Sequence, residues 1–149
     1  MVKLFAILTI LPVAALAADF SLTIGPPVAV GTDTKVVKKV AALFAVRLEQ
    51  CADLSKAQVT ASTMIAGNAQ SGSVVMIEPA GKPGIYLASQ NFDGRGNAVV
   101  TVTATCGGQE AGAIVPVVPA GYLRDSVQTF SRAPTRADAQ AALAKLQGR

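Results

Sequence analysis

The stretch AVVTVTATC, residues 98–106, alternates apolar and hydroxyl-bearing side chains from Val100 onward. Val100, Val102 and Ala104 share one side of an extended chain, because successive side chains of a strand point to opposite faces of a sheet. The threonines between them share the other side. This period of two residues predicts a β-strand whose valine face is directed toward a core.

Similar short runs, rich in Val and Thr and separated by Gly, Pro, Asn and Ser, occupy much of the remaining chain. That pattern is typical of an all-β domain. The further predicted strands are residues 20–24, resumed at 28–30 beyond Pro26-Pro27, and residues 57–61, 74–77, 85–89 and 111–118. The Gly- and Ser-rich segment 67–73 is predicted to be a flexible connection. With residues 41–50, these runs give about seven strands, which is typical of an immunoglobulin-like β-sandwich.

Residues 41–50 fit two kinds of element. Phe44, Val46 and Leu48 alternate with Ala, Arg and Glu, which predicts a half-buried strand. Phe44 and Leu48 also continue a helical spacing that begins at Val36. We favour the strand, because the second half of the segment alternates without a break.

Residues 1–17 have the three parts of a secretory signal peptide. Lys3 supplies the positive charge, and an uncharged apolar stretch follows it. The small-x-small pattern at residues 15–17 then predicts cleavage between Ala17 and Ala18. The mature chain is therefore expected in the periplasm or outside a bacterial cell.

A membrane anchor that stays attached is the alternative interpretation of this segment. The apolar run is shorter than the roughly 20 residues that a spanning helix needs, and Pro12 interrupts it. No later segment is long and apolar enough to cross a bilayer. We therefore favour cleavage and expect no membrane span afterwards.

Cys51 and Cys106 are the two cysteines of the chain. An even count in a small exported protein predicts a disulfide, which would stabilise the fold by about 4 kcal/mol. Two buried thiols are the alternative, and a redox pair is disfavoured because the C-x-x-C spacing is missing. Cys106 falls on the valine face, whereas Cys51 lies just past its strand, so the bridge should pin a strand end. The absence of Trp also departs from the antibody pattern.

At residues 132–149 the pattern changes from strand-like runs to a helical one. Thr135 is a candidate helix N-cap, and Asp138, three residues on, completes an imperfect capping box. An apolar stripe follows at helical spacing and comprises Ala139, Ala142, Leu143 and Leu146. A helix this short is marginal by itself, so we expect it to pack on the sandwich, the alternatives being fraying or docking on a partner. The predicted organisation is a signal peptide (1–17), a β-sandwich domain (18–131) and a helical tail (132–149).

The chain contains no histidine, which removes the Ser-His-Asp and Cys-His nucleophile systems and the commonest zinc and copper ligand. The 9 acidic residues lie in different runs, and no spacing selects the facing carboxylates that a glycosidase needs. Ser55 and Lys56 are neighbours on an extended chain and therefore point apart. We predict no catalytic residue, no metal and no cofactor.

The loop NFDGRGN, residues 91–97, offers Asn91, Asp93 and Asn97 as oxygen ligands. Calcium needs about six to eight oxygens, and this loop supplies few carboxylates and carries Arg95. Asp-Gly and Gly-Asn pairs are common in turns between strands. A hairpin loop is therefore favoured over a calcium site.

The formal net charge of +4 is modest, and the basic residues are scattered. Lys35, Lys38 and Lys39 form one cluster, which is typical of a solvated face. A nucleic-acid footprint would be a larger basic stripe with aromatic partners. We predict no nucleic-acid partner.

The segment RLEQCAD at residues 47–53 is followed by PGIY at residues 83–86, by Gly96 and by VTV at residues 100–102. The pattern is a Cys after an early strand, a Pro-Gly-x-Tyr that opens a later strand, and a Gly-containing turn into a Val-rich strand. In this pattern the chain resembles small, uncharacterised exported bacterial proteins with an immunoglobulin-like sandwich. The resemblance covers roughly residues 40–118. It implies fold and export, and it carries no functional residue, because such a fold does not define a function.

The favoured function is that of a non-enzymatic envelope module that binds another envelope protein through edge strands, loops or the helical tail. The alternative is a periplasmic small-molecule carrier, and a hydrolase with paired carboxylates comes third. An unpaired, uncharged sheet edge or an exposed apolar patch would indicate the first function. A concave apolar pocket with a few convergent polar groups would indicate the second.

Overall fold

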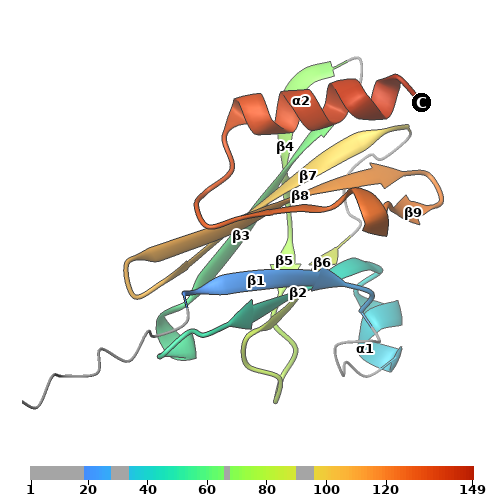
Figure 1. The fold of residues 1–149 in the computed structure, drawn as a ribbon. Coiled ribbons are helices and arrows are strands. Elements are labelled where there is room, and N and C mark those ends of the chain that lie inside the picture. Colours follow the sequence, from blue (N-terminus) through green and yellow to red (C-terminus); the bar gives the residue numbers. More distant parts are fainter. Residues whose placement is uncertain (1–18, 28–33, 66–67, 90–95) are drawn as a thin grey trace, which may run out of the picture.

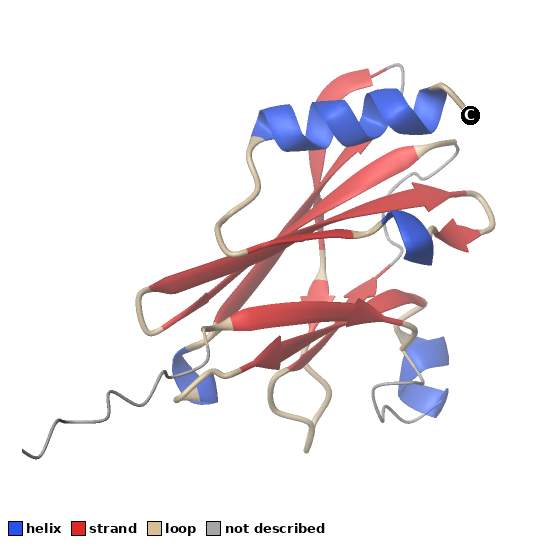
Figure 2. Cartoon of the chain, in the orientation of Figure 1, coloured by secondary structure: helices blue, strands red, loops and turns tan. Residues whose placement is uncertain are grey.

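The computed structural model describes residues 19–27, 34–65, 68–89 and 96–149, with residues 68–73 described as backbone (Figure 1). Three predictions lie outside these residues: the cleavage site at Ala17 and Ala18, the resumed strand at 28–30, and the centre of the 91–97 loop with Asn91 and Asp93. The described chain is mainly β, with two antiparallel sheets and a C-terminal helix (Figure 2). This coarse prediction is confirmed.

The two sheets have four and six strands. The first has the order β1-β2-β6-β5 and comprises β1 (Ser21–Gly25), β2 (Ala42–Glu49), β6 (Ile85–Ser89) and β5 (Met76–Ile77). The second has the order β10-β8-β7-β3-β4, with β9 also pairing with β8. It comprises β10 (Gln128–Phe130), β8 (Gln109–Val118), β7 (Ala98–Cys106), β3 (Gln58–Ile65), β4 (Asn68–Val74) and β9 (Gly121–Tyr122). The helices are α1 (Thr34–Lys39), η1 (Leu54–Lys56), η2 (Arg124–Ser126) and α2 (Arg136–Gln147).

Strand β4 corrects one prediction. Residues 68–73, expected in a flexible connection, pair with β3 in a register that runs from Ala61 opposite Val74 to Ile65 opposite Asn68. Asn, Gly and Ala have low strand propensity, so pairing with β3, and not the local sequence, makes this segment extended. Together with the short strands β9 and β10, β4 raises the strand count of the described chain above the predicted seven.

The ambiguous segment 41–50 is a strand, as predicted, and the helical spacing before it is also real. Thr34–Lys39 form α1, and Ala42–Glu49 form β2. Ala41, between them, has a φ of 48°, a left-handed conformation that ends the helical path. The two periodicities therefore belong to successive elements.

The main core lies between the two sheets. The buried alternate residues of β1, β2 and β6 pack against the buried alternate residues of β7 and β8. Phe44, fully buried on β2, belongs to this core, and the centroid of its ring is 5.9 Å from that of Tyr122. The valine face of residues 98–106 is directed into this core, as the alternation predicts.

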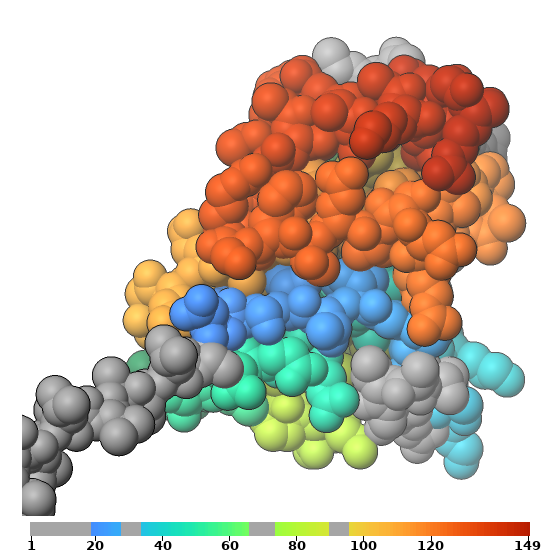
Figure 3. Space-filling view, in the orientation of Figure 1, coloured from blue at the N-terminus to red at the C-terminus, as the bar shows by residue number. Residues whose placement is uncertain are grey.

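Helix α2 covers the other face of the six-stranded sheet (Figures 1 and 3). Ala139, Ala142 and Leu146 pack there against Val99 and Ile114, which are fully buried on β7 and β8. The expectation that the tail packs on the sheets is therefore confirmed. Since β8 is covered on both faces, its central residues form a continuous apolar run and do not alternate.

Gly112 on β8 allows the chain to approach the sheet closely before α2 begins. A Cβ atom at this position would lie 2.2 Å from Cδ of Pro134 and 2.8 Å from the carbonyl oxygen of Val102. The segment that leads into α2 thus runs directly over a backbone position without a side chain. This contact fixes where the helix starts relative to the sheet.

The start of α2 is held by a complete capping box. The amide of Asp138 donates to Oγ1 of Thr135, and the amide of Thr135 donates to the Asp138 carboxylate. Arg132 also donates two hydrogen bonds to this carboxylate, at 2.7 and 3.2 Å, and its guanidinium lies over the Phe130 ring. The hydrogen bonds from Arg132, followed by those from Thr135, hold the pKa of Asp138 well below its usual range.

This arrangement predicts an acid-sensitive helix start. A carboxylate whose folded-state pKa is depressed contributes stability above its unfolded pKa of about 3.9 and loses that contribution as the pH falls further. We expect Asp138→Asn to lower the melting temperature at pH 7, and the difference from the wild type to shrink toward pH 2. Asp125→Asn is the control, since Asp125 is exposed and has no ion pair among the described residues. A difference that stays constant across this range would contradict the role of the charge.

The two cysteines form the predicted disulfide. Cys106 is the last residue of β7, and Cys51 follows β2 with Gln50 between, so the bridge joins the two sheets at their ends. Gln50 has a φ of 60°, which turns the chain away from β2 toward the bridge. The bridge pins strand ends, as the sequence predicts.

Candidate functional site

A single run of chain forms the edges of both sheets on one side of the molecule. β4 ends the six-stranded sheet, and β5, only one residue later, ends the four-stranded sheet. Val75 lies at the crossing, where its carbonyl accepts a hydrogen bond of 2.9 Å from the amide of Ser89. We call the run from Asn68 to Ile77 the crossing edge.

The crossing edge lacks the features that usually protect an exposed strand. Edge strands are normally blocked by charged side chains, by Pro or by pairing irregularities. The sequence NAQSGSVVMI has neither charge nor Pro. The one register shift lies near its start, where Ile65 pairs with Asn68, so residues 71–74 pair regularly with β3. Val75 is also 52% exposed, which is unusual for a large apolar side chain in this fold.

The edges on the opposite side are better protected. β1 is followed directly by Pro26-Pro27 and contacts β8 and β10 of the other sheet. The amide of Phe20, just before β1, donates to the Gln109 side chain. β10 contains only three residues. The crossing edge is therefore the more accessible pairing surface of the described chain.

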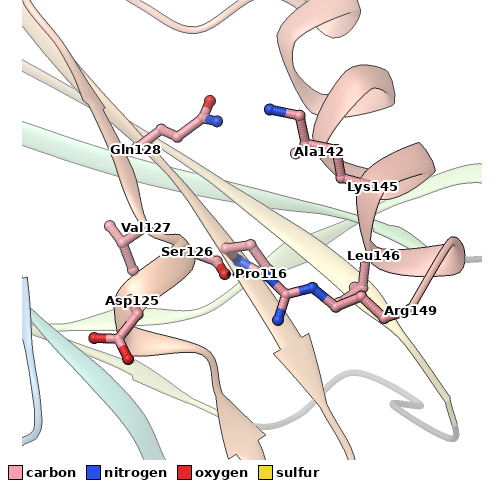
Figure 4. Close-up of a pocket in the computed structure, with 9 residues that line it drawn as sticks. All are labelled: Pro116, Asp125, Ser126, Val127, Gln128, Ala142, Lys145, Leu146 and Arg149. Carbon is pink, nitrogen blue, oxygen red and sulfur yellow. Dashed lines mark hydrogen bonds between the residues drawn. The ribbon is translucent and has the colours of Figure 1, made fainter.

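A groove of about 260 Å³ separates α2 from η2 and β10 (Figure 4). Its apolar wall consists of Pro116, Val127, Ala142 and Leu146, of which Pro116, Ala142 and Leu146 are buried. Its polar residues are Asp125, Ser126, Gln128, Lys145 and Arg149. Nη2 of Arg149 donates a 2.8 Å hydrogen bond to Oγ of Ser126 and thereby spans the groove.

A second, smaller cleft of about 200 Å³ lies at the other end of α2. Ser62 and Thr101, opposite each other on β3 and β7, form its floor, and Thr135 and Arg136 border it. Thr135 is already engaged in the capping box. Thr63 is nearly fully buried and its hydroxyl has no hydrogen-bond partner in the described chain, but its pairing with Val100 directs this side chain toward the inner core. The cleft therefore offers a ligand few free polar groups.

The candidate catalytic residues do not assemble into a site. Ser55 and Lys56 lie in η1 and not on an extended chain, which corrects the expectation that they point apart. Oγ of Ser55 donates to Asp53, and Lys56 forms an exposed ion pair with the same carboxylate, so both side chains are engaged by Asp53. No group of three or more acidic or cysteine side chains is close enough to hold a metal ion within the described ranges. The two tyrosines are not activated. Burial, followed by the charge of Glu78 and a hydrogen bond to it, raises the pKa of Tyr86; burial also raises that of Tyr122.

Sequence reasoning missed both the crossing edge and the groove. A signal for the edge was present, since residues 57–77 contain no charged side chain. The groove had no such signal, because it depends on how the last turns of α2 lie against η2.

Comparisons of the chain with protein-family models, with curated proteins and with solved structures found no match. Within the residues that the structure describes, no helix is both long and apolar enough to cross a membrane.

Proposed function

We propose that this chain is an exported, non-enzymatic module with an immunoglobulin-like β-sandwich, which binds an extended segment of another envelope protein. The partner segment adds as a further strand to β4, at the crossing edge. The observation that carries this proposal is a seven-residue edge strand with no charge and no Pro, next to an exposed valine.

Two observations support export and the finer fold assignment. The signal-like segment at residues 1–17 and the disulfide between Cys51 and Cys106 both suit an oxidising compartment. The chain forms two antiparallel sheets and crosses from one to the other at Val75. This arrangement supports an immunoglobulin-like sandwich.

Strand addition suits the chemistry of β4. An incoming strand gains main-chain hydrogen bonds from the edge, and its alternate side chains provide specificity. The sequence of β4 contains no charged residue, so no side-chain charge opposes a second strand. Val75 offers an apolar contact at the end of the strand, where the edge passes to β5.

The proposal predicts that charge at the edge abolishes binding. A photo-cross-linking amino acid replaces Ala69 in the full chain, which is expressed in its natural bacterial host. It should give a discrete adduct with one envelope protein. Ser71→Lys together with Ser73→Lys should reduce this adduct about tenfold or more, since lysines on an edge oppose strand addition. The matched control is Thr129→Lys, on the exposed edge strand β10 of the same sheet, which should leave the adduct unchanged.

Hydrogen exchange separates strand addition from contact through side chains alone. The outward amides of β4 should exchange fast in the free protein and become protected in the purified complex. An adduct that persists in the double lysine variant, or β4 amides that stay unprotected in the complex, would contradict the proposal. Circular dichroism and the melting temperature of each variant establish that the fold is intact.

A further inference from the structure

The groove between α2 and η2–β10 combines an apolar wall with a polar rim that includes two cations, Lys145 and Arg149. Pro116 and Leu146, both buried, contribute apolar surface from β8 and from α2. Lys145 and Arg149 extend into the groove from the last turn of α2 and beyond it (Figure 4). A small ligand in this groove therefore meets an apolar surface, two positive charges and one carboxylate, that of Asp125.

The charges are available to a ligand. Neither Lys145 nor Arg149 forms an ion pair with any carboxylate in the described part of the chain. Figure 4 shows the Lys145 ammonium directed toward the Gln128 amide, and Arg149 directed across the groove toward Ser126. The carboxylate of Asp125 points away from α2 in the same view. The negative end of the α2 dipole lies on this side, and the two cations offset it.

The groove suits an anion that carries an apolar group. A guanidinium and an ammonium form their strongest hydrogen bonds with carboxylate or phosphate oxygens. The Ser126 hydroxyl and Gln128 amide are neutral groups that can donate to the same oxygens. The volume of about 260 Å³ is below the range of about 300–1,000 Å³ of pockets for drug-sized ligands, so the ligand should be smaller than these.

We propose that this groove binds small amphipathic carboxylates, such as a medium-chain fatty acid. The carboxylate of the ligand lies between Lys145 and Arg149. It either displaces Arg149 from Ser126 or accepts hydrogen bonds from both Arg149 and Ser126. The hydrocarbon chain lies along Pro116, Ala142 and Leu146. This site is separate from the crossing edge, so its test is independent of the strand-addition proposal.

The test uses the full exported chain and three probes that separate charge from apolar contact. Octanoate carries both features, 1-octanol only the chain, and acetate only the carboxylate. Isothermal titration calorimetry should give a dissociation constant for octanoate at least about tenfold lower than for either other probe. Chemical-shift changes from octanoate should map to residues 142–149 and 125–128. The proposal would be overturned if 1-octanol or acetate bound as tightly as octanoate, or if octanoate did not bind. It would also be overturned if the chemical-shift changes mapped to other residues.

Variants of the rim provide a second test. Lys145→Gln and Arg149→Gln should each weaken octanoate binding about tenfold, because each removes a charge-assisted hydrogen bond. Arg136→Gln, an exposed cation at the opposite end of α2, is the matched control and should leave binding unchanged. Equal effects of all three substitutions would show general charge attraction and overturn the site. Since the three side chains are exposed, we expect each variant to fold.

Discussion

Replacing Cys51 and Cys106 together by alanine should lower the free energy of unfolding by about 4 kcal/mol. The disulfide closes a loop of sequence separation 55, so its removal returns much conformational freedom to the unfolded chain. For a domain of this size the melting temperature should fall by roughly 10–20 °C. Chemical denaturation of both proteins under non-reducing conditions measures the difference.

The wild type under reducing conditions provides the control. Reduction should destabilise the wild type by a similar amount and leave the double alanine variant unchanged. The bridge joins β7 to the chain beyond β2, so we expect the folded variant to keep its sheet content in circular dichroism. A loss below about 1 kcal/mol would indicate that the unfolded chain is already compact around these residues and would contradict this account.

Phe44→Ala should destabilise the fold by about 3–5 kcal/mol. Phe44 is fully buried on β2, in the core between the sheets, where its ring packs near Tyr122. Removing the ring loses the free energy gained by transferring it from water to the core. It also leaves a cavity, which the two sheets cannot fill without breaking other core contacts. Urea denaturation, with the slope compared between proteins, measures the change.

Val75→Ala is the matched control for this core substitution. Val75 is also apolar, but it is 52% exposed at the crossing edge. We expect a change within about 0.5 kcal/mol, as for other exposed positions. A loss for Phe44→Ala no greater than that for Val75→Ala would show that the inter-sheet layer is loosely packed.

Elements with a strong local pattern could be predicted from the sequence. The alternation at residues 98–106 and the run at 85–89 give β7 and β6 with their bounds as observed. The capping residues Thr135 and Asp138 mark the start of α2, since their hydrogen bonds are local in sequence. The disulfide followed from the cysteine count and the signal-like segment.

Features that depend on distant contacts could not be predicted. β4 has a loop-like composition, and only its pairing with β3 makes it a strand. β10 is three residues long and is extended because Gln128–Phe130 pair with residues 112–114 of β8. The groove needs Arg149 to lie beside Ser126, a contact across 23 residues of sequence that no local pattern encodes.

The disulfide makes the segment between Cys51 and Cys106 a covalent ring that contains β3, β4, β5, β6 and β7. A protease that cuts one peptide bond inside this ring releases no fragment while the bridge is intact. Exposed turns within the ring, such as the one at Lys82, are the positions where such nicks would occur. A nicked molecule therefore keeps all of its strands on one covalently connected chain.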